Sequence, residues 1–398
     1  MACCIFLPIM RYATTTLAFC VAGLLALGIV MIYSADVPKS GARFRTMQLW
    51  GAGLGMMVCF LAAAINYRWL KVIAWPLLGV TLLMLVLVLV PGIGIKLNGA
   101  RRWFDLGLMN FQPSELAKIT LLIAIAAWGD LQAKRMHEFK YGLVIPGVAI
   151  GVTLGLIFKE PDFGTTMLLA SVCCILLFVA GTSWKYLIPP MGVGFAAISI
   201  AIMNDPHRMG RIMAFLHPEQ HREGTGFQAY QAMLALGSGG STGLGLGNGH
   251  SKHGFVPELH TDFIFSLIGQ ELGLTTLVVV IAFMTIVGSG LFIAWNARDR
   301  FGVLLGAGIS FLIGLQAFIN IGVVTSALPN KGLPLPFISY GPSSLVMMLG
   351  GVGILLSIAS YSSVNKAELR ANEMIEEPDD SGFTSQQPSQ PELLPDSS

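Results

Sequence analysis

The sequence is poor in charged residues. Only 12% of its 398 residues are Asp, Glu, Lys or Arg, whereas 54% are hydrophobic. A soluble domain carries about a quarter charged residues, so this composition excludes a soluble protein of two or three domains and indicates a membrane protein with many spans. The formal net charge of +2 also leaves no basic surface of the kind that nucleic-acid binding requires. We therefore expect membrane embedding and no nucleic-acid partner.

Sequence signals of several other protein classes are also missing. The six cysteines lie at the N-terminus or inside apolar runs without C-x-x-C spacing, which argues against a disulfide framework or a zinc site. No small-residue cleavage pattern follows the first apolar run, so we predict that this run is an uncleaved first span. The glycine-rich stretch 237–249 lacks the spacing of a nucleotide-binding loop. We interpret it as flexible backbone close to a ligand or as packed irregular chain, and we expect no organic cofactor.

Long apolar runs dominate the sequence. A bilayer core of about 30 Å requires about 20 apolar residues per helix. The ten candidate runs are roughly 14–33, 46–65, 72–90, 113–128, 142–158, 164–181, 187–203, 263–295, 301–325 and 337–361. They predict an all-α polytopic membrane protein with about ten transmembrane helices. A large extracytoplasmic loop, 204–261, would lie between the seventh and eighth helices, and within it 227–236 is typical of an amphipathic interfacial helix.

The chain divides into two parts of different composition. Residues 1–361 form the predicted transmembrane domain, whereas 362–398 are acidic and rich in Pro, Ser and Gln, which predicts a disordered cytoplasmic tail. An even number of spans places both termini on one side. Lys and Arg are spread almost evenly over the two sides, so the positive-inside rule favours cytoplasmic termini only weakly.

One carboxylate stands at the junction between the polar loop and an apolar run. Asp262 follows Thr261, a plausible N-cap, and precedes the run 263–295. An anion at a membrane boundary is costly, but the first turn of a helix offers free N–H groups and a favourable dipole. We therefore predict a functional role for Asp262. Glu271, deeper in the same run, must be paired or protonated, and we interpret it as structural, with a proton relay as the alternative.

Two further groups of charged residues stand at the starts of apolar runs. Arg101 and Arg102 lie beside Trp103, and arginine forks suit phosphate oxygens, although anchoring in lipid headgroups is an equal alternative. Glu115 and Lys118 are three apart on one helix face, so we expect an ion pair that is structural or that lines a polar cavity. Asp162 is interpreted as a helix cap.

The segment 328–344 combines prolines and glycines at membrane depth. Irregular backbone is tolerated there only against protein or a water-filled cavity. It is a rigid loop that caps a cavity in one interpretation, and in the other Ser339 and Tyr340 offer hydroxyl groups to a ligand.

Four motifs, in chain order, carry a resemblance to a known family. They are NGARRWFDLGLMNFQPSELAK, KEPDFGTT, HGFVPELHTDFIF and LPNKGLPLPFISYG. Together they resemble the SEDS family (shape, elongation, division and sporulation) over nearly all of 14–361. The glycine-rich stretch and the segment beginning VVTSALPNKG are more similar to the division branch than to the elongation branch.

The resemblance implies a peptidoglycan glycosyltransferase with ten helices, which polymerises lipid II on the outer face of the bacterial cytoplasmic membrane, at the septum for a division enzyme. It implies Asp262 as the catalytic residue and a divalent cation, Mg²⁺ or Mn²⁺, as cofactor, with no metal ligands assigned. It also implies a class B penicillin-binding transpeptidase and proteins of the FtsQ-FtsL-FtsB type as partners. The predicted substrate-binding residues are Arg101, Arg102, Gln112, Glu115, Lys118, Glu258, Lys331, Ser339 and Tyr340.

The implied mechanism is general-base catalysis. Asp262 would take the proton of the acceptor 4-hydroxyl, and Arg101, Arg102, Lys118 or a metal would neutralise the leaving diphosphate. Glu258 is the only other carboxylate nearby in the sequence. A position in the first turn of a helix would weaken Asp262 as a base, so partial burial would have to act in the opposite direction.

The sequence departs from the family pattern at three positions, and other functions stay open. Gln270 stands where a glutamate is usual, and Ser326 and Pro342 each replace a usual glycine. The alternatives are a lipid II flippase or transporter, a non-enzymatic scaffold and the elongation polymerase. We find no inverted repeat of the kind that transporters show.

Overall fold

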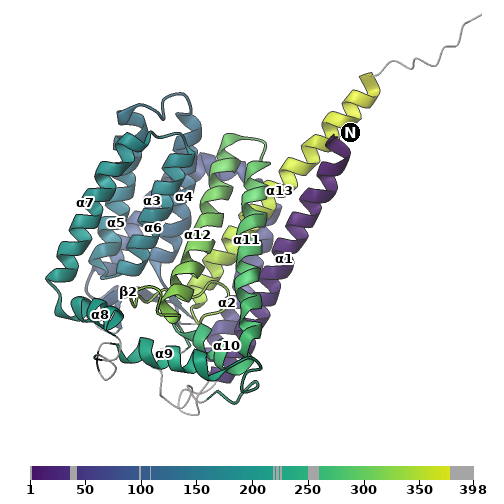
Figure 1. Cartoon of the computed structure of the whole chain (residues 1–398). Coiled ribbons are helices and arrows are strands. Elements are labelled where there is room, and N and C mark those ends of the chain that lie inside the picture. The colour runs from purple at the N-terminus through teal and green to yellow at the C-terminus, as the bar shows by residue number, and fades with distance from the viewer. Residues whose placement is uncertain are drawn as a thin grey trace, which may run out of the picture.

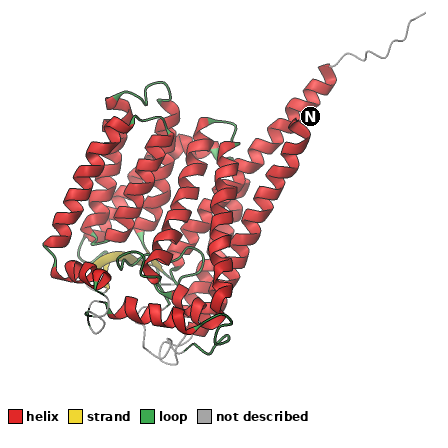
Figure 2. Cartoon of the chain, in the orientation of Figure 1, coloured by secondary structure: helices red, strands yellow, loops and turns green. Residues whose placement is uncertain are grey.

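The apolar runs form helices that pack side by side as a bundle (Figures 1 and 2). The structure is a computed structural model that describes residues 2–35, 43–97, 100–107, 109–217, 220, 224, 226–249 and 260–376. The helices of the bundle are α1 (Ala2–Ala35), α2 (Arg43–Ala64), α3 (Arg68–Leu89), α4 (Pro113–Leu131), α5 (Ile145–Lys159), α6 (Phe163–Val179), α7 (Trp184–Met203), α11 (Leu277–Trp295), α12 (Arg300–Val324) and α13 (Pro342–Glu376).

The helices confirm a polytopic membrane protein. Among the described residues, eight stretches are long and apolar enough to cross a bilayer: Ile9–Ala35, Phe44–Ala64, Arg68–Leu89, Lys140–Lys159, Trp184–Met203, Ile264–Trp295, Arg300–Val324 and Pro342–Ser362. The other two predicted runs form α4, which carries three charged residues, and α6, which has only 17 residues. Helix α4 packs against α3, α6 and α12 at the centre of the bundle, so its charged residues lie against protein.

The two ends of the bundle differ. The N-terminus and the end of α13 lie at one end, and the short helices α8 (Pro206–Leu216), α9 (Phe227–Ser238) and α10 (Ile264–Leu272) lie at the other (Figure 1). Helix α9 confirms the amphipathic helix predicted at 227–236. Helix α8 was not predicted, although Pro206 is well suited to a first helical position and apolar residues recur every three to four positions after it.

A small antiparallel sheet, which we did not predict, accompanies the helical bundle. Strands β1 (Ile95–Leu97), β2 (Ala100–Asp105) and β3 (Asn110–Phe111) pair in the order β1-β2-β3, with Leu97 opposite Ala100. The sequence contained the signal, because Asn-Gly between two short strands is the commonest two-residue hairpin connection. The sheet lies at the α8–α10 end of the bundle (Figure 2).

The predicted long run 263–295 is broken near its start. Helix α10 ends at Leu272, a 3₁₀ turn covers Gly273–Thr276, and α11 follows. Gly273 has φ of +61°, which favours glycine, and a Cβ there would lie only 2.4 Å from the backbone nitrogen of Gly243. The glycine-rich stretch therefore passes directly against the end of α10. This contact supports its interpretation as packed irregular chain.

Glu271 has a structural role in this contact. Its carboxylate accepts hydrogen bonds from the Ser34 hydroxyl (2.7 Å) and from the backbone nitrogens of Gly247 (3.1 Å) and Gly249 (3.2 Å). Three donors satisfy a buried carboxylate that would otherwise be costly. Glu271 thus joins α10, α1 and the glycine-rich stretch, as its structural interpretation required.

The C-terminal boundary differs from the prediction. Helix α13 continues to Glu376, beyond the boundary predicted at residue 361. The sequence 365–376 is rich in Ala, Glu, Leu, Lys and Arg, which have high helix propensity. Our prediction overlooked this local preference because it relied on the loss of apolar residues. The rest of the predicted disordered tail, 377–398, lies outside the described residues.

Candidate active site

Asp262 lies in a turn rather than in a helix. Helix α10 begins at Ile264 and has no acidic residue in its first turn, so the predicted N-cap at Thr261 is wrong. The capping position is Phe263, whose backbone (φ −111°, ψ 16°) is not helical and whose side chain is 1% exposed. Burial of this ring in the core favours a tight turn before the helix. Asp262 is therefore placed at the loop side of the boundary, half-buried.

A glycine from the α12–α13 connection lies directly against the Asp262 carboxylate. A Cβ added to Gly332 would be 2.6 Å from Asp262 Oδ2, so a side chain there would displace the carboxylate. On its other side, the Gly332 carbonyl oxygen would be 3.1 Å from a Cβ added to Gly164, in the first turn of α6. Two glycines therefore allow the Asp262 turn, the connection and α6 to meet.

One buried asparagine joins the Asp262 turn to the same connection. Asn320 on α12 is 1% exposed, and its Nδ2 donates to the backbone oxygens of Asp262 (2.8 Å) and Leu333 (2.7 Å). The backbone nitrogen of Tyr340 donates to the oxygen of His260 (2.9 Å). Hydrogen bonds at two points therefore fix the turn that carries Asp262 to the α12–α13 connection.

The predicted ion pair lies beneath this connection. Lys118 Nζ and Glu115 Oε2 are 2.7 Å apart, with side chains 0% and 4% exposed. Lys118 also donates to Gln316 Oε1 (3.0 Å), and Gln316 Nε2 donates to the Pro334 oxygen (2.8 Å). The pair that we predicted from spacing is thus present. Its burial and its connection through Gln316 favour the structural interpretation, and contact with substrate stays a prediction.

The paired arginines do not act alike. They alternate on β2, so their side chains leave opposite faces of the strand. Arg102 donates from Nε to the Glu160 oxygen (2.6 Å) and from NH2 to the Pro161 oxygen (2.8 Å), and so joins the sheet to the α5–α6 connection. The prediction that both arginines hold an anion therefore rests mainly on Arg101, which is half-buried.

Carboxylates gather at the start of α6. Asp162 Oδ1 accepts from the Thr165 nitrogen (3.1 Å), which confirms the predicted cap. Gln112 Nε2 donates to Asp162 Oδ2 (3.3 Å), so this predicted binding residue joins α4 to α6. Glu160 is 0% exposed, and neither carboxylate oxygen has a hydrogen-bond partner among the described residues. Burial, and secondarily Asp162, raise its pKa to about 8, while Arg102 opposes the shift.

The remaining predicted binding residues have different surroundings. Lys331 is half-buried with its Nζ against Met167 Sδ, and burial lowers its pKa. Ser339 is buried, and its hydroxyl accepts from the Leu335 nitrogen (2.7 Å), so the loop itself uses this group. The Tyr340 ring packs edge-on against Phe44, with centroids 5.0 Å apart. Glu258 lies outside the described residues.

The sequence analysis missed the neutral polar residues that hold the site. Gln48 on α2 donates to the Ser339 oxygen (3.4 Å) and accepts from the Gly341 nitrogen (3.3 Å). Gln48, Gln316 and Asn320 all interrupt apolar runs, and a polar residue inside a membrane span is a signal for function. The prediction named charged residues and the hydroxyl groups of Ser339 and Tyr340, but not these three amides.

The three departures from the family pattern are accommodated locally. Pro342 begins α13, where its fixed φ suits a first helical position. Gly51 on α2 leaves room for it, because a Cβ there would be 2.9 Å from the Pro342 Cα. Gln270 donates to the Ser238 hydroxyl (3.0 Å). Ser326 has φ of +56°, a conformation that costs a serine more than a glycine.

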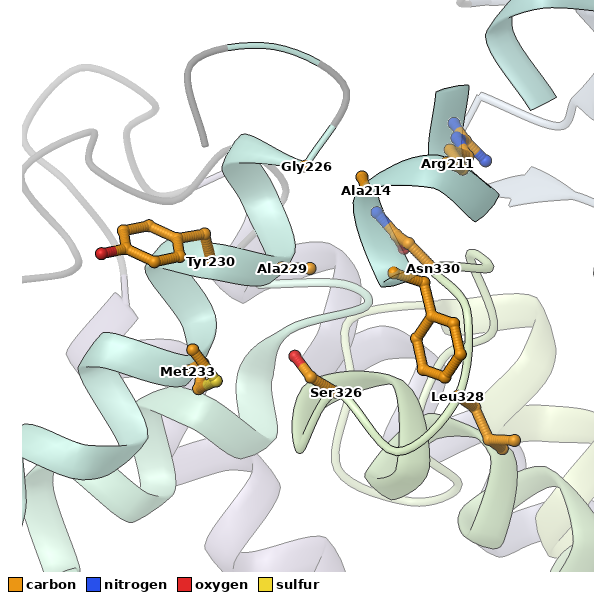
Figure 3. Close-up of a pocket in the computed structure, with 10 residues that line it drawn as sticks. Arg211, Ala214, Gly226, Ala229, Tyr230, Met233, Ser326, Leu328 and Asn330 are labelled. Atoms are coloured by element: carbon orange, nitrogen blue, oxygen red, sulfur yellow. The ribbon is translucent and has the colours of Figure 1, made fainter. Parts of the chain in front are cut away.

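A pocket adjoins the site on the side of the short helices (Figure 3). Its cavity volume is about 50 Å³. Helices α8 and α9 and the α12–α13 connection contribute its lining: Arg211, Ala214, Phe215, Gly226, Ala229, Tyr230, Met233, Ser326, Leu328 and Asn330. Asn330, in this lining, is two residues before Gly332, which contacts Asp262.

Comparison with known proteins gives the same family as the four sequence motifs. The chain matches the model of the FtsW/RodA/SpoVE family, described as "Cell cycle protein", over residues 15–364. It belongs to this family. A relative from Geobacter metallireducens, "Probable peptidoglycan glycosyltransferase FtsW", is 41% identical over 88% of this chain and 95% of its own length. "Stage V sporulation protein E" of Bacillus subtilis is 35% identical over 85% of this chain and 94% of its own length.

Solved structures agree on the fold. A chain from a structure described as "Structural coordination of polymerization and crosslinking by a peptidoglycan synthase complex" has a TM-score of 0.73 and 28% identity, covering 87% of this chain and 97% of that chain. The rod shape determining protein RodA of Thermus thermophilus has a TM-score of 0.64 and 29% identity, covering 86% of this chain and 95% of its own.

Proposed function

We propose that this protein is a peptidoglycan glycosyltransferase that polymerises lipid II during cell division, with Asp262 as its general base. The names of the curated relatives support the activity and the division role. One structural observation carries the assignment of the residue: the Asp262 carboxylate faces Gly332 while Asn320 holds its backbone. A side chain fixed in this way is preorganised, as a catalytic base must be.

In the proposed step, Asp262 accepts the proton of the acceptor 4-hydroxyl while that oxygen attacks the anomeric carbon of the donor. The bond from this carbon to the diphosphate breaks with inversion, and the diphosphate leaves with its electron pair. The turn conformation removes one difficulty, because Asp262 is outside the first turn of α10, where the helix dipole would weaken it as a base. Arg101 and Lys331 are the cationic candidates to neutralise the diphosphate.

A divalent cation, Mg²⁺ or Mn²⁺, is part of the proposal. Among the described residues, no group of three or more His, Cys, Asp or Glu side chains gathers as a metal site. Mg²⁺ commonly uses one or two carboxylates together with substrate phosphates. We assign no protein ligand to the cation, because Asp262 serves as the base; the diphosphate oxygens would hold the cation, and it would supply positive charge to the leaving group.

The proposed location and partners follow the family. We place the protein in the bacterial cytoplasmic membrane at the septum, with its termini cytoplasmic and the Asp262 end of the bundle outside. The similar chain in the peptidoglycan synthase complex supports a class B penicillin-binding transpeptidase as partner. Proteins of the FtsQ-FtsL-FtsB type are proposed as further partners in division.

The decisive experiment is Asp262→Ala in the purified protein, tested with its transpeptidase partner. We expect at least a hundredfold loss of glycan strands made from added lipid II, because removing a general base costs about 10²–10⁴-fold. Thermal unfolding should be unchanged within a few degrees, and Asp105→Ala, an exposed carboxylate on β2, serves as the matched control.

Full activity of Asp262→Ala would remove this residue from the mechanism. A wild-type protein that makes no strands but moves lipid II across vesicle membranes would be a flippase. Strand synthesis that persists through the partner alone would indicate a scaffold.

A further inference from the structure

A second cavity lies between α1 and α2, away from the predicted arginines. It has a volume of about 320 Å³, within the range of small-molecule sites. Its lining consists of Ile29, Ile32, Tyr33, Arg45, Thr46, Gln48 and Leu49. We call it the α1–α2 groove. None of the sequence motifs singled out above includes these residues.

The groove is amphipathic along its length. Ile29, Ile32 and Leu49 form an apolar wall, and Leu49 is exposed at the molecular surface. Arg45 supplies a cation, and its guanidinium carbon lies 4.9 Å from the centroid of the Tyr33 ring. An aromatic ring beside an arginine holds the planar guanidinium in a defined orientation, and a guanidinium is suited to phosphate oxygens.

The position in the membrane fits a lipid with a charged head. The groove residues belong to the last turns of the span Ile9–Ala35 and the first turns of the span Phe44–Ala64. Arg45 is therefore at the boundary of the apolar layer, where arginine side chains meet headgroup phosphates. The apolar wall extends from there toward the interior of the bilayer.

The groove shares residues with the wall of the active site. Phe44, next to Arg45, has its ring centroid 5.0 Å from that of His260, two residues before Asp262. Gln48 lines the groove and also holds the backbone of Ser339 and Gly341. Phe44 and Gln48 thus connect the groove to the His260–Asp262 turn and to the α12–α13 connection.

We propose that the α1–α2 groove binds the lipid diphosphate portion of the substrate, with its phosphates at Arg45 and its polyprenyl chain along Ile29, Ile32 and Leu49. The inference rests on the proposed function for the identity of the lipid. A single arginine alone would also accept an ordinary phospholipid, but the contact of the groove with the catalytic loop favours the substrate. Through the neighbouring contact between Phe44 and His260, a lipid bound in the groove then lies next to the turn that carries Asp262.

The test measures binding and activity separately. Radiolabelled undecaprenyl diphosphate is titrated onto the full-length protein in phosphatidylcholine nanodiscs, and lipid II polymerisation is measured on the same preparations. Arg45→Gln removes the cation, and Leu49→Trp fills the apolar wall. The matched controls are Arg135→Gln, an exposed arginine between α4 and α5, and Leu54→Trp, an exposed leucine further along α2.

We expect Arg45→Gln and Leu49→Trp each to weaken binding about tenfold, the effect of one charge-assisted contact or one apolar side chain. The KM for lipid II should rise by a similar factor while kcat changes less than twofold. The controls should match the wild-type protein. Phosphatidylglycerol at equal mole fraction should compete poorly.

Three results would overturn the inference: unchanged binding in both groove variants, equal loss in the controls, or equal competition by phosphatidylglycerol, which would make the groove a general phospholipid site. Failure of the proposed function gives a different pattern. In that case the wild-type protein binds undecaprenyl diphosphate through Arg45 but polymerises no lipid II.

Discussion

At the scale of single residues, the site depends on two positions without side chains. Gly332 leaves space for the Asp262 carboxylate, and Gly164 leaves space for the Gly332 carbonyl. A methyl group at Gly332 would displace the Asp262 carboxylate, and one at Gly164 would press on the Leu333 side chain and the Gly332 carbonyl oxygen. The identity of these residues is therefore set by close approach and not by backbone conformation, because neither has positive φ.

Glu160 leads to a prediction about pH. Burial raises its pKa from an unfolded value of 4.5 to about 8, so the folded protein retains a proton that the unfolded chain releases. Stability is unaffected below pH 4.5, falls as pH rises from 4.5 to 8, and is lowest above pH 8. We expect Glu160→Gln to flatten this slope and to stabilise the protein at pH 8 by at most about 5 kcal/mol, since one pKa unit is about 1.4 kcal/mol.

Thermal unfolding in detergent between pH 5 and pH 9 measures this effect. Glu138→Gln, which removes an exposed carboxylate, is the control. Equal pH slopes in the wild-type protein and Glu160→Gln would show that Glu160 does not bind the proton in the folded state.

At the scale of elements, one face of helix α12 holds the turn that carries Asp262. Gln316 and Asn320 are four residues apart and so lie on one face of the helix. They bind the oxygens of Pro334, Leu333 and Asp262. One helix face therefore holds both the α12–α13 connection and the turn that carries Asp262.

We expect Asn320→Leu to lower the polymerisation rate at least tenfold, because two buried carbonyl oxygens lose their donor and the turn loses its attachment. Each unsatisfied group also costs about 1–3 kcal/mol of stability. Initial rates and melting temperature measure the two effects. The control is Thr325→Val, at the end of the same helix, since the Thr325 hydroxyl bonds only within its own helix. An unaltered rate in Asn320→Leu would show that the turn does not need this attachment.

The elements also show what the sequence could predict. The ion pair of Glu115 and Lys118 followed from a spacing of three on a helix, and α9 followed from its amphipathic pattern. The break at Gly273 did not follow, because it depends on contact with residues about 30 positions earlier in the chain. Asn320 was missed for the same reason, since its partner Asp262 is 58 residues away.

At the scale of the whole molecule, the N-terminus and the end of α13 lie at the opposite end of the bundle from the site (Figure 1). Apolar runs alone predicted the polytopic architecture, because burial in lipid is a property of composition. The direction of insertion depends on Lys and Arg counts that were nearly balanced. For this reason the proposed orientation requires its own measurement.

We expect an epitope inserted after Gly224, between α8 and α9, to be cleaved by protease added to intact spheroplasts. An epitope fused after Ser398 should be cleaved only after lysis. Complete protection of the first epitope and cleavage of the second would reverse the orientation and place Asp262 in the cytoplasm. Strand synthesis by both tagged proteins is the control for folding.

The break between α10 and α11 has a mechanical consequence. Helix α10 is a rigid segment of nine residues with the Asp262 turn at one end and Gly273 at the other. Gly273 lets the chain change direction between α10 and α11. The end of α10 at Gly273 packs against the glycine-rich stretch. A change in the position of that stretch would therefore be transmitted through α10 to the Asp262 turn.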